Sequence, residues 1–265
     1  MASRSGTTES PIRRTLAWVG FVLMIASAVW WQLLPRRGGV RTSAEILINP
    51  VTRVVIDAGH GGNDSGALRA DVMEKDLTLD VAQRLDQILR GRGLATTLTR
   101  SGDETVSLAK RAELANQEDD CVFVSIHFDE GARASATGVQ TFYAARKKPP
   151  TRLAPSWLPS LQKASTGPDN LESQSLAGFV QEALVTRTQA FDRGTRSEQF
   201  YVVVNVRHPA VLVEGGFISN DADLARLKSE KYRQSLAGAI GDGVLRYRQI
   251  SSQTQATVAA SGARN

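Results

Sequence analysis

Hydrophobic positions recur along this chain in two different patterns. Short apolar runs alternate with longer stretches in which apolar residues lie three or four positions apart, as at Leu77, Val81 and Leu85. The first pattern is typical of buried strands, and the second is typical of helices with one buried face. The predicted strands are residues 54–56, 96–98, 121–126, 139–143, 201–204 and 211–213, and the predicted helices include residues 77–88, 108–115, 173–184 and 236–244.

This alternation predicts one α/β domain over residues 51–250, with a mixed, largely parallel sheet. Residues 146–172 interrupt the pattern, because they contain five of the nine prolines of the chain. A proline-rich insertion of this length is either functional, for example as a lid over a cleft, or a solvated loop without a role. We expect residues 251–265 to form a disordered tail.

An uncharged segment near the amino terminus has the length of a membrane span. Residues 16–34 contain no charged side chain, and arginine pairs flank them on both sides. As a helix, these nineteen residues would extend about 28 Å, close to the thickness of the hydrocarbon core of a bilayer. Three interpretations are open: a transmembrane signal anchor, which we favour, a signal peptide cleaved near residues 26–28, and a buried core helix. Residues 1–15 form a short basic segment before it, and residues 35–50 form a linker after it.

The positive charge of the chain lies at its ends. The whole sequence has a formal net charge of +5, but residues 51–250 contain 25 basic and 25 acidic residues. A neutral folded region lacks the electrostatic basis for binding nucleic acid, so no nucleic-acid partner is expected. The single cysteine excludes an intramolecular disulfide and a cysteine-rich zinc site.

Three residues with metal-binding side chains lie next to predicted strand ends or turns. His60 follows a short apolar strand and lies between glycines, and His127 ends a second apolar strand. Glu74 begins a predicted helix fourteen residues after His60. Taken singly, each has an ordinary structural explanation: a turn, a core histidine, or an acid at a helix start. Together, two histidines and a glutamate at one sheet edge match a catalytic zinc set that leaves a position for water.

A further acid lies at the end of a very apolar strand. Glu214 follows the predicted strand 211–213 and precedes two glycines. A glutamate in this position is either buried at a high energetic cost or directed into a site. Gly215 and Gly216 permit close approach of a substrate to the backbone. Glu214 is therefore the candidate base that would activate the water.

Four motifs occur in order along the chain: residues 57–62 (DAGHGG), 74–79 (EKDLTL), 125–127 (SIH) and 209–220 (PAVLVEGGFISN). They resemble the amidase 3 family of zinc-dependent N-acetylmuramoyl-L-alanine amidases, over about residues 51–248. The resemblance implies a twisted mixed sheet with helices on both faces. It also implies an enzyme that cleaves peptidoglycan at the amide between the lactyl group of N-acetylmuramic acid and the L-alanine of the stem peptide.

The same resemblance implies roles for individual residues. His60, Glu74 and His127 would be the zinc ligands, and Glu214 would be the catalytic acid/base. A zinc ion at these ligands would polarise the lactyl carbonyl and lower the pKa of water toward about 7.

One position departs from the family pattern. Phe128 and Asp129 stand where the family usually has a small residue, often followed by asparagine. We expect this departure to narrow the cleft or to change substrate contacts. Asp129, His208 and Arg100 are further candidates for contact with the substrate.

Two other functions stay open from the sequence: a zinc peptidase that cuts within the stem peptide, and an inactive domain that binds the wall or regulates a partner. The complete set of site residues argues against the inactive domain. The expected partners are peptidoglycan and, if residues 16–34 are not cleaved, the membrane; the sequence does not identify an activating protein. We expect the catalytic domain to act outside the cytoplasm. It would be anchored to the cytoplasmic membrane and face the periplasm or cell wall, or be secreted after cleavage.

Overall fold

The computed structural model describes residues 51–128, 135–145 and 170–262, all of which belong to one unit, Ile48–Asn265. The predicted amino-terminal segment, apolar span and linker, residues 1–50, lie outside the described residues. Residues 146–169 of the predicted proline-rich insertion lie outside them too. Among the described residues, no helix combines the length and the apolar character that a membrane span requires.

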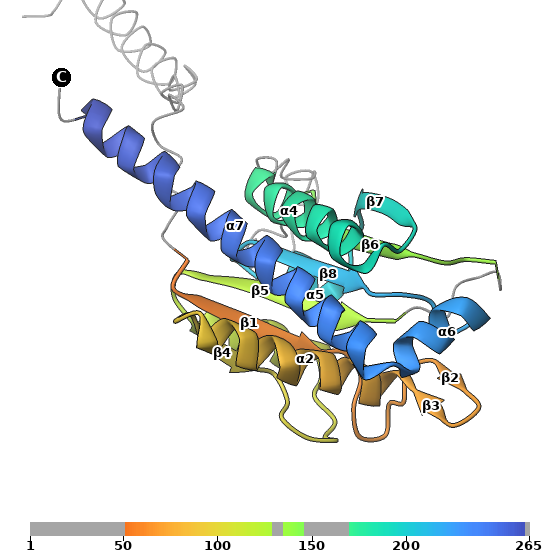
Figure 1. Ribbon diagram of the computed structural model, residues 1–265. Coiled ribbons are helices and arrows are strands. Elements are labelled where there is room, and N and C mark those ends of the chain that lie inside the picture. The colour runs from red at the N-terminus through yellow and green to blue at the C-terminus, as the bar shows by residue number, and fades with distance from the viewer. Residues whose placement is uncertain (1–50, 129–134, 146–169, 263–265) are drawn as a thin grey trace, which may run out of the picture. The chain divides into compact units, whose positions relative to one another are not determined.

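A six-stranded sheet forms the centre of the domain (Figure 1), with the strand order β4-β1-β5-β8-β6-β7. The only antiparallel neighbours among these described strands are β6 and β8, so the prediction of a mixed, largely parallel sheet is confirmed. The strands are β1 (Arg53–Ala58), β4 (Ala95–Leu98), β5 (Cys121–His127), β6 (Val139–Tyr143), β7 (Asp192–Ser197) and β8 (Ala210–Glu214).

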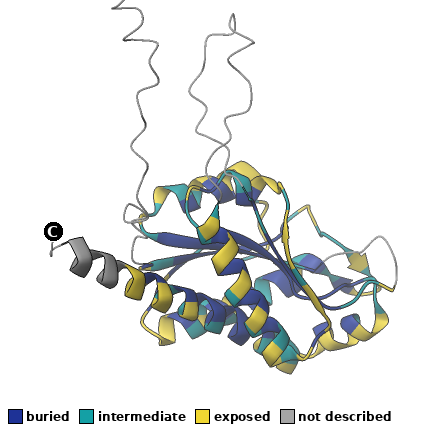
Figure 2. Ribbon diagram, turned by 90° about the horizontal axis from the view of Figure 1, so that it is seen from above, coloured by how far each residue is buried: buried dark blue, intermediate teal, exposed yellow. Residues whose placement is uncertain are grey.

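Helices cover both faces of the sheet, and each face has its own apolar cluster. On β1, Val54 and Ile56 belong to one cluster, whereas Val55 between them belongs to the other, because successive side chains of a strand point to opposite faces. In Figure 2 the central strands are accordingly coloured as buried. The first face carries α2 (Glu74–Gly91), α4 (Leu171–Thr188) and α7 (Glu230–Gly262), and the second carries α3 (Leu108–Gln117) and α5 (Tyr201–Val204).

Two short elements escaped the sequence prediction. A small hairpin of β2 (Leu68–Arg69) and β3 (Val72–Met73) leads directly into α2, and two-residue strands are too short to show a pattern. The edge strand β7 has the sequence DRGTRS and is largely exposed, so it lacks the apolar run that marks a buried strand. A further helix, α6 (Asp221–Lys228), follows the turn after β8.

The predicted strand at residues 201–204 was wrong, because these residues form the one-turn helix α5. Three consecutive valines favour a strand by intrinsic preference. The backbone amides of Val203 and Val204 instead bond to the carbonyl of Phe200, and Val202 and Val203 are buried against α3 and β8. Tertiary packing has overridden the local preference of this segment.

The predicted disordered tail, residues 251–265, differs from the structure over residues 251–262, because α7 continues to Gly262; residues 263–265 lie outside the described residues. Ser251 is buried, and its hydroxyl donates to the carbonyl of Tyr247 at 2.8 Å. The following sequence includes Ala256, Ala259 and Ala260. Extending a helix that is already formed avoids the cost of nucleation, and alanine has the highest helix propensity.

Candidate metal centre and active site

The first site segment is the turn that follows β1. His60 adopts a left-handed backbone with φ of 60°, and Gly61 and Gly62 follow with φ of 124° and 59°. A left-handed conformation costs a residue such as histidine about 1–2 kcal/mol, so neighbouring contacts must hold it. The glycines relieve the rest of the turn of that cost.

Two buried arginines bind the carbonyls of this turn. Arg111 donates to the carbonyl of His60 at 2.6 Å and to that of Ala58 at 2.5 Å. Arg100 donates to the carbonyls of Ala58 at 3.0 Å and Gly59 at 2.8 Å. The guanidinium groups of these two arginines therefore hold three successive carbonyls, those of Ala58, Gly59 and His60.

This placement corrects the prediction that Arg100 contacts the substrate. Arg100 is only 2% exposed. Besides the turn, its guanidinium also bonds to the carbonyls of Lys75 and Gly102 and to the hydroxyl of Thr78. Because its donors are directed at groups of the chain itself, Arg100 supports the turn and does not reach into an open cleft.

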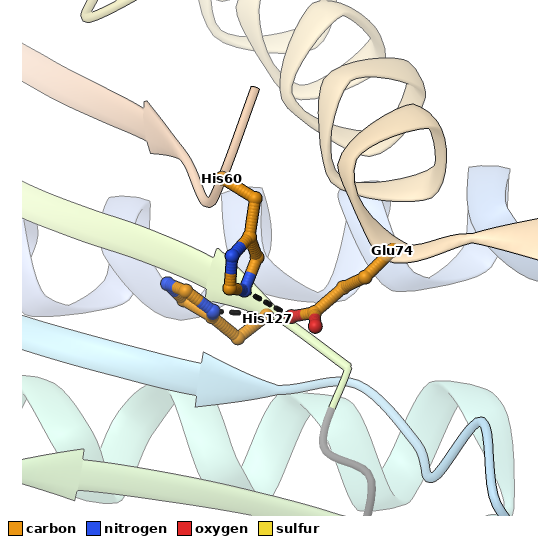
Figure 3. A group of neighbouring side chains, drawn as sticks. All are labelled: His60, Glu74 and His127. Atoms are coloured by element: carbon orange, nitrogen blue, oxygen red, sulfur yellow. Dashed lines mark hydrogen bonds and ion pairs between the residues drawn. The ribbon is translucent and has the colours of Figure 1, made fainter. Parts of the chain in front are cut away.

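The side chains of His60, Glu74 and His127 meet at the carboxyl ends of β1 and β5 (Figure 3). His60 Nε2 lies 3.1 Å from Glu74 Oε1, and His127 Nδ1 lies 3.1 Å from the same oxygen. One ligand atom from each residue falls within 4.8 Å of the others. Residues that are up to 67 positions apart in sequence thus form one cluster, as the sequence predicted for them.

The carboxylate of Glu74 is fixed by backbone donors. Its Oε1 accepts from the amide of Phe128 at 2.9 Å, and its Oε2 accepts from the amide of Ala67 at 2.9 Å. Burial raises the pKa of Glu74, but hydrogen bonds from His127 and His60 outweigh this effect and hold the pKa well below its ordinary value. Glu74 is therefore an anion aimed at two imidazole rings.

His60 has a partner for each ring nitrogen. Burial lowers its pKa, but hydrogen bonds to Glu74 and Asp64 outweigh this effect and leave the pKa above the ordinary value. Nδ1 lies 2.9 Å from Asp64 Oδ2. A carboxylate at Nδ1 fixes the ring orientation and directs Nε2 to the centre of the cluster, as outer carboxylates do for histidines that bind metals.

The donor set fits a zinc ion. Two imidazole nitrogens and one carboxylate oxygen are the ligand types of catalytic zinc sites, and tetrahedral zinc keeps its ligand atoms about 3.3 Å apart. The two separations that involve Glu74 Oε1 are 3.1 Å each, close to this value, and all three ligand atoms lie within 4.8 Å of one another. A Cβ on Gly59 would lie 2.5 Å from the ring of His127, and one on Gly66 would lie 2.6 Å from Glu74 Oε2. Only glycine leaves the room that these side chains occupy.

Glu214 ends β8 at the same sheet edge. It is 8% exposed and pairs in register with His127 of β5 on one side and with Gln140 of β6 on the other. The amide of Gly215 donates to the carbonyl of His127 at 3.0 Å. The candidate base is thus placed by the strand that adjoins a candidate ligand.

Phe128 does not narrow a cleft, which corrects the expectation from its departure from the family pattern. Its side chain is fully buried, and a Cβ on Gly215 would lie 2.7 Å from its ring. The ring of Phe128 therefore packs against the backbone of Gly215, directly after Glu214. Asp129, the other residue at this departure, lies outside the described residues.

His208 lies at the other end of the strand from the site. It precedes β8, whose first residue is Ala210, whereas Glu214 is the last residue of the strand. Six residues of extended chain span about 20 Å. The prediction that His208 contacts substrate at this centre is therefore not supported by its place in the fold.

Two buried carboxylates that hold backbone or side-chain groups in place were missed from the sequence. Asp57 is 1% exposed and pairs with Arg111 at 2.6 Å beneath the His60 turn. Asp223 is also buried, and it accepts from the amides of Gly138 at 2.9 Å and Phe217 at 3.1 Å. Asp57 belongs to a motif that the resemblance covered, but the pattern gives no signal that it pairs with an arginine 54 positions away.

Comparison with known proteins gives one consistent family. The family model described as N-acetylmuramoyl-L-alanine amidase matches residues 54–246. The chain is 35% identical over 194 residues to the uncharacterized protein YqiI of Bacillus subtilis, covering 73% of this chain and 84% of that protein. It is 31% identical over 218 residues to the N-acetylmuramoyl-L-alanine amidase AmiA of Escherichia coli, covering 73% of this chain and 75% of AmiA.

Solved structures agree with these relatives. The catalytic domain of the amidase CwlV from Paenibacillus polymyxa is similar with a TM-score of 0.62 and 31% identity, covering 74% of this chain and 97% of that domain. The CwlD amidase from Clostridioides difficile, solved in complex with the GerS lipoprotein, is similar with a TM-score of 0.63 and 26% identity. That match covers 75% of this chain and 99% of CwlD.

Proposed function

The chain belongs to the N-acetylmuramoyl-L-alanine amidase family, and from this premise we propose that it hydrolyses the amide bond between the lactyl group of N-acetylmuramic acid and the L-alanine of the stem peptide. Its substrate is peptidoglycan, and its role lies in cell-wall remodelling, cell-wall turnover or cell separation. The observation that carries the proposal is that the ligand atoms of His60, Glu74 and His127 lie within 4.8 Å of one another. Glu214 lies opposite His127 in the register of the neighbouring strands β8 and β5.

We propose that His60, Glu74 and His127 hold a zinc ion. The short separations of the donor atoms and the outer carboxylate of Asp64 support this assignment. When bound, zinc supplies a Lewis acid that polarises the scissile carbonyl and lowers the pKa of water to about 7. The three side chains would supply three protein ligands, the number typical of catalytic zinc sites.

Glu214 is proposed to transfer the protons of the reaction. Its carboxylate takes a proton from the attacking water and later delivers a proton to the departing nitrogen of L-alanine. A buried carboxylate is suited to this exchange, because little bulk water competes for its oxygens. No covalent intermediate on the protein is needed, because water is the nucleophile.

The cellular setting follows from the family and from the sequence. Enzymes that act on the cell wall act outside the cytoplasm, which supports an extracytoplasmic location for residues 51–250. We propose that residues 16–34 deliver this catalytic domain, either as a membrane anchor or as a cleaved signal peptide. The complex of CwlD with a lipoprotein makes an activating partner worth testing for this chain.

Muropeptide analysis tests the proposed reaction. The purified full-length chain is incubated with sacculi, with and without a zinc chelator, and the soluble products are identified by mass spectrometry. We expect whole stem peptides that begin with L-alanine and glycan strands without peptides, and the chelator should abolish both. Products cut within the stem would identify a zinc peptidase instead, and full release in the presence of chelator would contradict a metal-dependent reaction.

A further inference from the structure

A buried ion pair contacts the backbone turn that carries His60, one of the candidate metal ligands. Asp57 and Arg111 contact each other at 2.6 Å, and the exposed fractions of their side chains are 1% and 4%. Burying two charges costs several kcal/mol per ion, and an apolar pair of the same volume is often no less stable. Stability alone is therefore a weak explanation for this pair, and its remaining contacts indicate what else it does.

The Asp57 side of the pair reaches the strand that carries His127. Asp57 is in register with Ser125 of β5, and Asp57 Oδ2 accepts from the hydroxyl of Ser125 at 2.7 Å. Ser125 lies two residues before His127, so both side chains project from the same side of β5. Asp57 Oδ1 accepts from Arg111 and from the hydroxyl of Thr99, each at 2.6 Å.

The Arg111 side of the pair reaches the turn that carries His60. Its guanidinium donates to the carbonyl of His60 at 2.6 Å and to that of Ala58 at 2.5 Å. A third contact, from Nε to the carbonyl of Val106 at 3.0 Å, fixes the guanidinium itself. Because His60 is held in a left-handed backbone, loss of its carbonyl partner would free the turn to relax.

We infer that the Asp57–Arg111 pair is a positioning device that sets the distance between the two histidines of the metal centre. Through Ser125 it holds the strand of His127, and through backbone carbonyls it holds the turn of His60. Neither residue touches the position of the metal, so the pair acts only through the ligands. This inference rests on the proposed function, since it assumes that the cluster binds zinc.

Replacing Arg111 by lysine separates positioning from simple support. Lysine retains the charge beside Asp57, but one ammonium group cannot reproduce the planar set of donors that reaches Ala58, His60 and Val106 together. The matched control is Arg233→Lys. Arg233 also forms an ion pair with a carboxylate, that of Asp80 at 2.5 Å, and also donates to backbone carbonyls, those of Leu227 and Lys228. These contacts connect α7 to α2 and α6, and none of them involves the turn of His60.

The experiment measures the zinc affinity of each purified full-length variant by competition with a chromogenic chelator. Urea unfolding of the metal-free chains measures stability, and the absorption spectrum of the cobalt-substituted chains reports ligand geometry. We expect R111K to bind zinc about tenfold more weakly and to change the cobalt spectrum, as loss of outer contacts does at other metal sites. R233K should lose stability without either change.

A second variant guards against poor folding of R111K. Ser125→Ala removes the bond from Asp57 to β5 and leaves only a small void, and we expect it to weaken zinc binding as well. Zinc affinity unchanged in both R111K and S125A would overturn the inference, as would an equal loss of affinity in R233K. If the unmodified chain bound no zinc, the proposed function itself would fail. If the unmodified chain bound zinc and hydrolysed the substrate, and R111K bound zinc with the same affinity, only the positioning role would be excluded.

Discussion

Glu214 and His127 lie opposite each other in the parallel pairing of β8 with β5. This relationship places a carboxylate from one strand beside an imidazole from the next, at the edge where both strands end. In open α/β sheets, this edge is where ligands bind. The pairing gives the two residues different proposed roles, one in proton transfer and one in metal binding, and variants can separate them.

Glu214→Gln should retain zinc and lose turnover. The amide has nearly the same shape as the carboxylate but cannot accept the proton from water, and general acid–base catalysis contributes about 10²- to 10⁴-fold. Zinc content and release of stem peptides from sacculi are measured on the same preparation. Glu113→Gln, at an exposed position on α3, is the control and should behave like the unmodified chain. Full activity of E214Q would exclude Glu214 as the proton carrier.

His60→Ala should lose both zinc and activity. Two protein ligands hold zinc far more weakly than three, and catalytic sites with three protein ligands are the rule. Metal analysis after gel filtration gives the zinc content, and the unfolding midpoint shows whether the chain is still folded. A folded H60A chain with one equivalent of zinc would mean that the ion binds elsewhere.

Gly215→Ala should destabilise the protein by about 1–3 kcal/mol, because the new Cβ is forced into a packed core. That Cβ would lie 2.7 Å from the ring of Phe128. Gly178→Ala is the matched control: Gly178 lies inside α4 with nothing within 4 Å of a new Cβ, and alanine there should stabilise the helix by about 0.5–1 kcal/mol. Urea unfolding measures both changes. The double variant G215A/F128L should recover part of the lost stability. If the stability of G215A equalled that of the unmodified chain, the contact with Phe128 would be one that small shifts relieve.

Stability should fall in acid partly through Asp80, which joins α2 to α7. Partial burial raises the pKa of Asp80, but hydrogen bonds from Arg84 and Arg233 outweigh this effect and hold the pKa below its ordinary value of 3.8. A lowered pKa in the folded state means that the carboxylate stabilises the fold at pH values above 3.8. This contribution is lost as the pH falls through the lower folded pKa.

The variant Asp80→Asn isolates this contribution. Because about a third of the Asp80 side chain is exposed, we expect a loss of roughly 1 kcal/mol near pH 7. The difference in unfolding free energy between D80N and the unmodified chain should shrink as the pH is lowered to 3. A difference that is constant between pH 7 and pH 3 would show that the charge of Asp80 does not matter.

Several structural features could be predicted because the residues that determine them are close together in the sequence. The apolar runs of β1, β5 and β8 mark strands that are buried on both faces, and the spacing of Leu77, Val81 and Leu85 marks α2. Local sequence failed where tertiary contacts decide the conformation. The valines of α5 form a helix in spite of their strand preference, and the polar edge strand β7 forms because β6 offers it a pairing partner.

For the site, the sequence by itself determined which side chains carry chemistry: two histidines and a glutamate, each next to a strand end or a helix start, and a further glutamate after an apolar strand. Only the tertiary structure decided which polar residues support them. Arg100 and His208 were candidates for the substrate, but burial turns one toward the backbone and strand direction places the other about 20 Å from the site. The pairing of Asp57 with Arg111 needs strand and helix to pack, because residues 54 positions apart meet only when the sheet has formed.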